Sequence, residues 1–240
     1  MNKLDILALA AHPDDVELSC SGTLMAHIAM GYRVGILDLT QGEMGSRGTV
    51  QTRKAEAEEA SRIMGLHERQ NLAFSDVFFE ESNDNVLEIV RWIRYYQPKI
   101  LLANAPKDRH PDHGKAARLA EKAFFWSGLS KIETHFNNVP QLPWRPQALY
   151  HYIQSQYLEP DFVVDISEFW HRKMMAVKAF KTQFYDPDNT QEPATFISTP
   201  QFLDFLFARA KEFGQAIRTD FGEGFIKNRQ LGIKDLNNLI

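Results

Sequence analysis

Two short segments of the sequence combine histidine and aspartate at spacings that suit a metal site. The first is His12-Pro13-Asp14-Asp15, and the second is Asp108-Arg109-His110-Pro111-Asp112-His113. A catalytic zinc ion takes about three nitrogen or oxygen ligands from the protein and keeps one position open for water. His12 and Asp15 can both reach one ion from a single tight loop. A histidine of the second segment would complete the set, and the spacing leaves open which of its two histidines does so.

The two neighbouring aspartates of the first segment divide into different roles. Asp15, as a ligand, is committed to the metal, whereas Asp14 can take a proton from water whose pKa the ion lowers to about 7. Of His110 and His113, the one that does not bind the metal would face it as a protonated or hydrogen-bonding group. Asp112 can hold that imidazole in one tautomer and raise its pKa. The pattern predicts hydrolysis by activated water, without a serine or cysteine nucleophile.

Strands and helices are expected to alternate in the first half of the chain. Buried strands are predicted at 4–11, 33–39, 70–74 and 100–105, and helices at 22–30, 52–64, 86–96 and 114–126. Such alternation implies right-handed crossovers and a parallel sheet that is covered on both faces. We therefore predict an α/β fold with a Rossmann-like, mostly parallel sheet and helices on both faces.

The second half is less regular and is expected to extend the same α/β domain, which we predict to span residues 1–240. Strands are predicted at 148–153 and 162–164, and helices at 168–180 and 200–219. The segment 186–200 is polar and contains three prolines, so we expect a loop there and treat it as a candidate lid.

The two histidine-aspartate segments follow the first and fourth predicted strands. Parallel sheets bind their ligands beyond the carboxyl ends of the strands, so we expect the two segments to meet at one edge. Neither a G-x-G-x-x-G fingerprint nor a phosphate-binding P-loop occurs, and two carboxylates after the first strand would repel a pyrophosphate. The alternative for the first segment is a turn with an aspartate helix cap, but a second such segment at a neighbouring strand end argues against coincidence.

The composition excludes several classes of protein. The 240 residues carry 27 Lys and Arg against 31 Asp and Glu, a net charge of −4, which disfavours binding to nucleic acids. A single cysteine, Cys20, excludes an internal disulfide and a metal cluster held by thiolates alone, and we expect it to be a small buried side chain. No apolar run approaches the roughly 20 residues of a membrane span, and no export signal is recognised, so a cytoplasmic location without membrane contact is expected.

Arginines near the strand ends are candidates for substrate binding. Arg53 and Arg109 are favoured, and Arg47 is as compatible with an ordinary solvated position as with binding. The planar guanidinium suits carboxylates or vicinal hydroxyls. The other histidines are interpreted as structural or surface residues: His27, His67, His135, His151 and His171.

The segment Ala11–Asp15 with Glu17 and Gly22-Thr23-Leu24, followed by His110–His113, resembles the zinc-dependent N-acetylglucosaminyl deacetylases of the PIG-L or LmbE-like superfamily. Further segments resemble its bacillithiol-biosynthesis branch, which deacetylates N-acetylglucosaminyl-L-malate. These are Leu39–Glu43, Arg47–Thr49, Arg109–Gly114, Pro160–Ser167 and Gly222–Phe225.

The resemblance implies that His12, Asp15 and His113 bind zinc. Fe²⁺ is the alternative ion, because affinity alone does not select zinc over iron. The resemblance also implies that Asp14 is the general base and that His110, oriented by Asp112, assists the tetrahedral intermediate and the leaving amine. The candidate substrate-binding residues are Arg53, Arg109, Arg47 and Glu43. The sequence departs from the family pattern at Ser19 and Ser21, where glycines are common, and at Asp108, where some sugar deacetylases have a tyrosine.

The expected function is removal of an acetyl group from an N-acetylglucosamine moiety, foremost N-acetylglucosaminyl-L-malate, a small substrate with an acidic aglycone. Free N-acetylglucosamine or a chitin fragment is the alternative substrate. Two alternatives come from other classes: a non-haem Fe(II) oxygenase that uses two histidines and one carboxylate, and a metal-stabilised binding module without turnover. The family resemblance further suggests a homo-oligomer, with a hexamer as one form.

Overall fold

A single sheet organises the computed structural model, which describes residues 3–187, 192–235, 237 and 239. Its strands are β1 (Ile6–Ala10), β2 (Val34–Thr40), β3 (Glu68–Phe74), β4 (Ile100–Ala103), β7 (Ala148–Tyr152), β8 (Phe162–Asp165) and β9 (Gly222–Lys227). They form a seven-stranded sheet in the order β3-β2-β1-β4-β7-β9-β8. The neighbouring strands β3, β2, β1, β4 and β7 run parallel, whereas β9 is antiparallel to both β7 and β8. A separate two-stranded sheet joins β5 (His135–Phe136) to β6 (Val139–Pro140).

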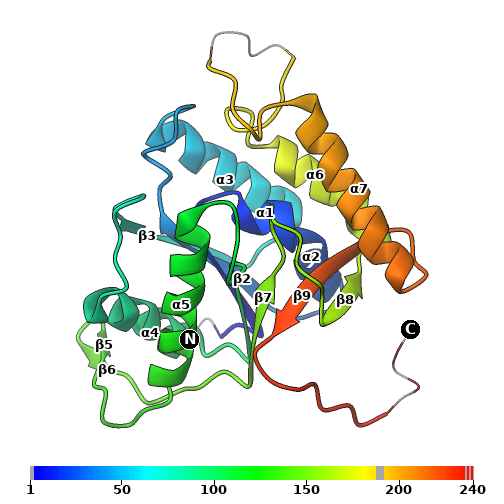
Figure 1. Ribbon diagram of the computed structural model, residues 1–240. Coiled ribbons are helices and arrows are strands. Elements are labelled where there is room, and N and C mark those ends of the chain that lie inside the picture. Colours follow the sequence, from blue (N-terminus) through cyan, green and yellow to red (C-terminus); the bar gives the residue numbers. More distant parts are fainter. Residues whose placement is uncertain (1–2, 188–191, 236, 238, 240) are drawn as a thin grey trace.

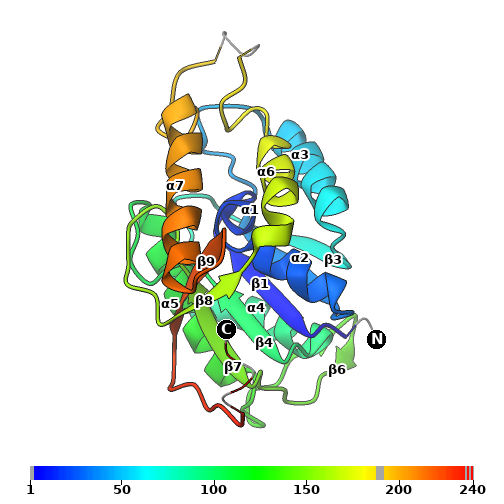
Figure 2. The same ribbon diagram turned by 90° about the vertical axis from the view of Figure 1, so that its right-hand side faces the viewer.

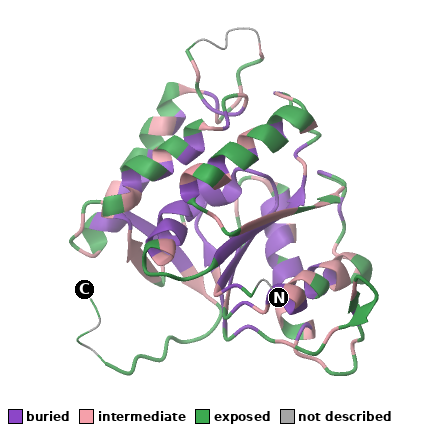
Figure 3. Cartoon of the chain, turned by 180° about the vertical axis from the view of Figure 1, so that it is seen from behind, coloured by how far each residue is buried: buried purple, intermediate pink, exposed green. Residues whose placement is uncertain are grey.

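Helices cover both faces of the sheet (Figures 1 and 2). On one face lie α1 (Asp15–Ser19), α2 (Ser21–Ala29), α3 (Val50–Met64), α6 (Trp170–Lys178) and α7 (Pro200–Ala216), with a short 3-10 turn at Ser167–Phe169 before α6. On the other lie α4 (Asn83–Tyr96) and α5 (Pro111–Trp126). Side chains alternate between the faces along a strand: Ile6 and Ala8 pack in the first core, and Leu7 and Leu9 in the second. Because both faces are covered, the central strands are buried throughout (Figure 3).

The predicted fold class is confirmed, and the main departures lie near the second half of the sheet. Residues 222–227 form β9, a strand that is not predicted from the sequence because Gly222-Glu223-Gly224 has low strand propensity. The short helix α1 was also not predicted. Within the predicted loop 186–200, the described residues before Pro200 contain no regular helix or strand, and residues 188–191 lie outside the described residues. In the described part of the chain, no helix is both long and apolar enough to cross a bilayer.

The order of the strands decides where the site lies. β1 pairs with β2 on one side and with β4 on the other, so Leu7 lies opposite both Gly35 and Leu101. The chain winds outward in opposite directions from β1 and β4, which makes their carboxyl ends the switch point of the sheet. The loops after these two strands therefore lie side by side, in agreement with the arrangement predicted for the two histidine-aspartate segments.

A buried ion pair joins the antiparallel part of the sheet to the helices. The Glu223 carboxylate on β9 accepts hydrogen bonds from the backbone N–H groups of Gly22 and Thr23, at 3.0 and 2.7 Å. It also accepts hydrogen bonds from the Thr23 hydroxyl and, at 2.6 Å, from Lys173 Nζ. Lys173 donates a further hydrogen bond to the carbonyl of Leu18. All four protein donors to this carboxylate are thus buried, and the first turn of α2 receives a negative charge at its N-terminus.

Replacement of Glu223 by Gln is expected to lower the free energy of unfolding by about 3 kcal/mol, because the buried Lys173 loses its counter-ion. The matched control is Asp161→Asn, which weakens the partly exposed ion pair between Lys227 and Asp161 and should cost less than about 1 kcal/mol. Urea unfolding of both variants measures the difference. An equal loss of unfolding free energy in the two variants would show that the buried ion pair of Glu223 and Lys173 stabilises the fold no more than the partly exposed one.

Candidate metal centre

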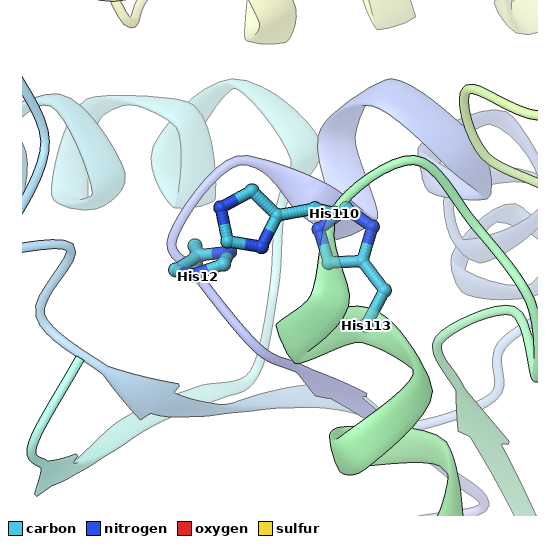
Figure 4. Close-up of side chains that lie close together, drawn as sticks. All are labelled: His12, His110 and His113. Carbon is cyan, nitrogen blue, oxygen red and sulfur yellow. The ribbon is translucent and has the colours of Figure 1, made fainter. Parts of the chain in front are cut away.

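Three histidines meet at the switch point of the sheet (Figure 4). His12 comes from the loop after β1, and His110 and His113 come from the start of α5, where His110 is the N-cap residue and Pro111 the first residue of the helix. The ring centroid of His12 lies 4.7 Å from that of His110 and 5.6 Å from that of His113. One ring nitrogen of each lies within 4.8 Å of the others, a separation compatible with one metal ion.

The His113 ring lies between two carboxylates. Its Nδ1 is 2.5 Å from Asp108 Oδ2, and its Nε2 is 3.0 Å from Asp15 Oδ1. Burial opposes the charged imidazole, but Asp15 and Asp108 together raise the pKa of His113 to about 9. Asp108 is itself fixed by the backbone N–H of Gln156, which donates a hydrogen bond to its other oxygen.

The His12 ring is arranged in the same way. Its Nε2 is 3.0 Å from Asp76 Oδ1 and 3.5 Å from Asp112 Oδ2, while its Nδ1 is 3.7 Å from Asp15 Oδ2. Although burial opposes the charged imidazole, the three carboxylates raise the pKa of His12 well above its usual range. Asp76 is not predicted from the sequence, because it is a single aspartate after β3 without a histidine or a second aspartate beside it.

The Asp15 carboxylate faces the imidazole rings of both His12 and His113. Besides facing the two rings, its carboxylate accepts hydrogen bonds from the backbone N–H of His12 and from the side-chain amides of Asn104 and Gln154, at 2.9, 2.9 and 3.0 Å. Burial would raise its pKa, but His113 and His12 hold it well below the usual range. Asp15 therefore remains ionised and is fixed in orientation by neutral donors.

His110 differs from the other two histidines. Its side chain is 35% exposed, and its Nδ1 accepts a hydrogen bond from the backbone N–H of Asp112. Burial, together with the positive charges of His12 and His113, lowers the pKa of His110. A neutral ring that accepts at Nδ1 carries its proton at Nε2, so that nitrogen is left as a donor.

Asp112 lies closer to His12 than to His110. Its Oδ2 is 3.5 Å from His12 Nε2 and 4.0 Å from His110 Nδ1. It also accepts hydrogen bonds from the backbone N–H of Val77 and from Lys115 Nζ. Although burial opposes ionisation, His12 and Lys115 hold the pKa of Asp112 well below its usual range. The contact of this carboxylate with His12 was not foreseen from the sequence.

Asp14 is a buried carboxylate on a strained backbone. Its φ is 129° and its ψ is −23°, a backbone conformation that residues other than glycine rarely adopt. Arg53 Nη2 donates to the carbonyl of Pro13 at 2.8 Å and to Asp14 Oδ2 at 3.3 Å. Burial outweighs the opposing effect of Arg53 and raises the pKa of Asp14 to about 7. The side chain is therefore held beside the histidines with a pKa suited to proton transfer.

A cavity of about 180 Å³ opens over these groups. Its walls include His12, Asp14, Asp15, His110, His113, Arg53, Arg109, Gln154, Gln183 and Arg209, with Leu18, Met44, Ile197, Phe202, Phe205 and Leu206 as apolar surface. Arg47 and Glu43 stand outside the described walls. Arg47 Nε lies 3.4 Å from Glu192, and Glu43 accepts a hydrogen bond from the backbone N–H of Asp76. Of the four predicted substrate-binding residues, the cavity thus brings together Arg53 and Arg109.

The strain at Asp14 predicts an inverted order of stability for two variants. Asp14→Gly should be more stable than Asp14→Ala by about 1 kcal/mol, because glycine tolerates the positive φ that alanine does not. At an unstrained position such as exposed Glu58 in the middle of α3, alanine should instead be the more stable by about 0.5–1 kcal/mol. Urea unfolding of the two variant pairs measures both differences. The same order at both positions would contradict strain at Asp14.

Comparison with known proteins identifies the family. Residues 7–124 match the family described as PIG-L, GlcNAc-PI de-N-acetylase. A diacetylchitobiose deacetylase of Thermococcus kodakarensis is 30% identical over 189 residues, which cover 75% of this chain and 70% of that enzyme. A probable N-acetyl-alpha-D-glucosaminyl L-malate deacetylase 2 of Bacillus cereus is 27% identical over 191 residues, covering 74% of this chain and 83% of that protein.

Two further comparisons bear on the fold and on the range of reactions. The crystal structure of a conserved protein of Thermus thermophilus superposes with a TM-score of 0.85 and 36% identity, over 96% of this chain and 98% of that one. A 4-oxalmesaconate hydratase of Pseudomonas putida is 23% identical over 192 residues, 74% of this chain and 73% of that enzyme. The identity and coverage of the Thermococcus enzyme, with the family match, show that this chain belongs to the PIG-L family of de-N-acetylases, hydrolases that act on N-acetyl sugars.

Proposed function

We propose that the chain is a metal-dependent deacetylase of an N-acetylglucosamine moiety and that His12, Asp15 and His113 hold the metal. One observation carries the proposal. Each of the two imidazoles has one nitrogen against a peripheral carboxylate, Asp76 or Asp108, and the other nitrogen facing Asp15. Histidine ligands of metals have this arrangement, because the outer carboxylate fixes the tautomer and increases the basicity of the coordinating nitrogen.

The chemistry of these donors fits a divalent cation. Two nitrogens and one carboxylate are a common ligand set of catalytic zinc, and the same set also suits Fe²⁺. Carboxylates outnumber the histidines around the centre, since Asp14, Asp76, Asp108 and Asp112 surround the proposed ligands. A bound cation would offset this concentration of negative charge. His110 is favoured as a non-ligand, because its Nδ1 is occupied by a backbone donor and its ring is the most exposed of the three.

A cation at this centre, when bound, polarises the acetyl carbonyl and lowers the pKa of the attacking water. Asp14 accepts the proton of that water as the new C–O bond forms. As the C–N bond breaks, Asp14 returns the proton to the sugar nitrogen, so that acetate and a free amine result. His110 donates its Nε2 proton to the developing oxyanion as a hydrogen bond, which is worth a few kcal/mol in the transition state. Arg53 holds Asp14 through its 3.3 Å contact and keeps the carboxylate directed into the cavity.

The favoured substrate is a sugar with an acidic aglycone, such as N-acetylglucosaminyl-L-malate. Arg109 lines the cavity, and its guanidinium lies 4.6 Å from the centre of the Phe196 ring. The similarity to the Bacillus cereus protein supports this choice. Diacetylchitobiose is the second candidate, supported by the similarity to the Thermococcus enzyme.

Asp14→Asn is expected to lower kcat at least about 100-fold, because the amide cannot accept the proton of the attacking water. The variant should keep the fold and bind the same amount of metal as the wild type. The assay measures acetate and free amine from the malate glycoside, with zinc-loaded protein under anaerobic conditions, and metal content is measured on the same samples.

Turnover by the anaerobic zinc-loaded wild type would exclude an oxygenase. Near-wild-type activity of Asp14→Asn would contradict the assignment of Asp14 as the base. Absence of acetate release by the wild type from every N-acetylglucosamine compound tested would overturn the proposed function itself.

Asp108→Asn is expected to weaken zinc binding about tenfold, because a neutral amide supports the His113 imidazole less well than a carboxylate does. Titration of the apoprotein with zinc against a competing chelator measures the change. Asp220→Asn is the matched control, since this exposed carboxylate pairs with Lys211 at the surface and its loss should leave the affinity unchanged. An unchanged affinity in Asp108→Asn would argue against His113 as a ligand.

A further inference from the structure

Arg209 on α7 is a buried cation in the wall of the same cavity. The residue is 9% exposed, and its Nη1 is buried without a hydrogen-bond partner. Within the described residues, its guanidinium takes part in no hydrogen bond or ion pair, and its one specific contact is with the Phe205 ring, 5.1 Å from the centroid. Burial lowers the pKa of Arg209 to about 10, so the side chain is still positively charged at neutral pH.

The carboxylates that act on Arg209 from a distance are already engaged. Asp108 and Glu223 are the two acidic groups whose charge acts on it. Asp108 is bound to His113 and to the backbone of Gln156, and Glu223 is bound to Lys173 and to the first turn of α2. A buried charge without a close counter-ion destabilises a fold by several kcal/mol unless something else compensates for it. The position of Arg209 is therefore not explained by folding.

Arg109 presents a second guanidinium to this cavity. Like Arg209, it packs against a phenylalanine near the start of α7, since Arg109 lies over Phe196 and Arg209 over Phe205. The third arginine of the walls, Arg53, already donates to Pro13 and Asp14. Among the three arginines of the wall, Arg109 and Arg209 are thus the two whose guanidinium groups make no hydrogen bond within the described residues, and each packs against a phenylalanine ring.

We propose that Arg209, together with Arg109, binds an anionic group in the aglycone of the substrate. Arg209 is therefore a specificity-determining residue. This inference rests on the proposed deacetylase function. Arg209 on α7 selects for acidic glycosides, whereas the histidine-aspartate centre acts on the acetyl group that all candidate substrates share. A carboxylate fits the planar guanidinium through two parallel hydrogen bonds, which lysine cannot make.

The test compares two substrates, N-acetylglucosaminyl-L-malate and diacetylchitobiose, in the zinc-loaded wild type and in Arg209→Gln. The ratio of kcat/KM for the acidic substrate to that for the neutral one should fall at least about tenfold in Arg209→Gln, because a bond to a charged group is lost. Arg209→Lys should restore part of the ratio. Lys211→Gln, an exposed substitution on the same helix, should keep the wild-type ratio. An unchanged ratio in Arg209→Gln would overturn the inference.

A binding measurement separates this inference from the proposed function. L-malate should raise the Tm of the metal-free wild type and of Lys211→Gln, and should raise that of Arg209→Gln much less. If the wild type releases no acetate from either substrate but L-malate still stabilises it through Arg209, the deacetylase proposal fails and the anion site stands. If acetate is released while L-malate stabilises wild type and Arg209→Gln equally, the anion site fails alone.

Thermal unfolding without ligand excludes a purely structural role. Arg209→Met should keep or raise the Tm, because it removes a buried charge that has no close partner. A clear fall in Tm, together with an unchanged substrate ratio in Arg209→Gln, would show that Arg209 serves to pack α7 against its aromatic neighbours.

Discussion

The negative charge of Asp15 is the constraint on which the rest of the site depends. A buried carboxylate is costly unless donors surround it, and here the donors come from four separate elements: the loop after β1, the end of β4, the segment after β7 and the first turn of α5. These elements meet only because β1, β4 and β7 are neighbours in the sheet. The strand order thus places the carboxylate, and the carboxylate in turn orients His12 and His113.

Two further carboxylates, Asp76 and Asp108, fix the same imidazole rings from the side away from Asp15. Asp76 and Asp108 each hold the far nitrogen of one imidazole, and each is fixed by a backbone N–H, from Met44 and from Gln156. The orientation of the rings therefore depends on loops well separated in sequence. Asp14 shows the corresponding cost, because it reaches the centre only with a positive φ. Strain of this kind persists where the surrounding structure over-determines the backbone, as it does in a loop held at both ends by strands and helices.

Much of the fold and the two histidine-aspartate segments could be predicted from the sequence, because both are local patterns. Apolar strands, helix-forming stretches and their order imply the parallel sheet, and the sheet places His12 beside His113. The roles of Asp76 and Gln154 could not be predicted, since each depends on a contact across 64 or 139 residues of chain. For Arg47 the sequence left a solvated position and a binding role equally open, and its Nε lies 3.4 Å from Glu192, a contact across 145 residues of chain that no local pattern predicts.

The two halves of the chain contribute different things to the cavity. The groups proposed to act on the acetyl moiety come from residues 12–113, within the family match that covers 7–124. Gln183, Phe202, Phe205 and Arg209 also line the cavity and come from beyond that match. Arg109, inside the match, and Arg209, outside it, are the two residues that we propose to meet the aglycone. Under this proposal the histidine-aspartate centre acts on the acetyl group, whereas the positive charge of Arg209 on the α7 wall selects among the glycosides that carry that group.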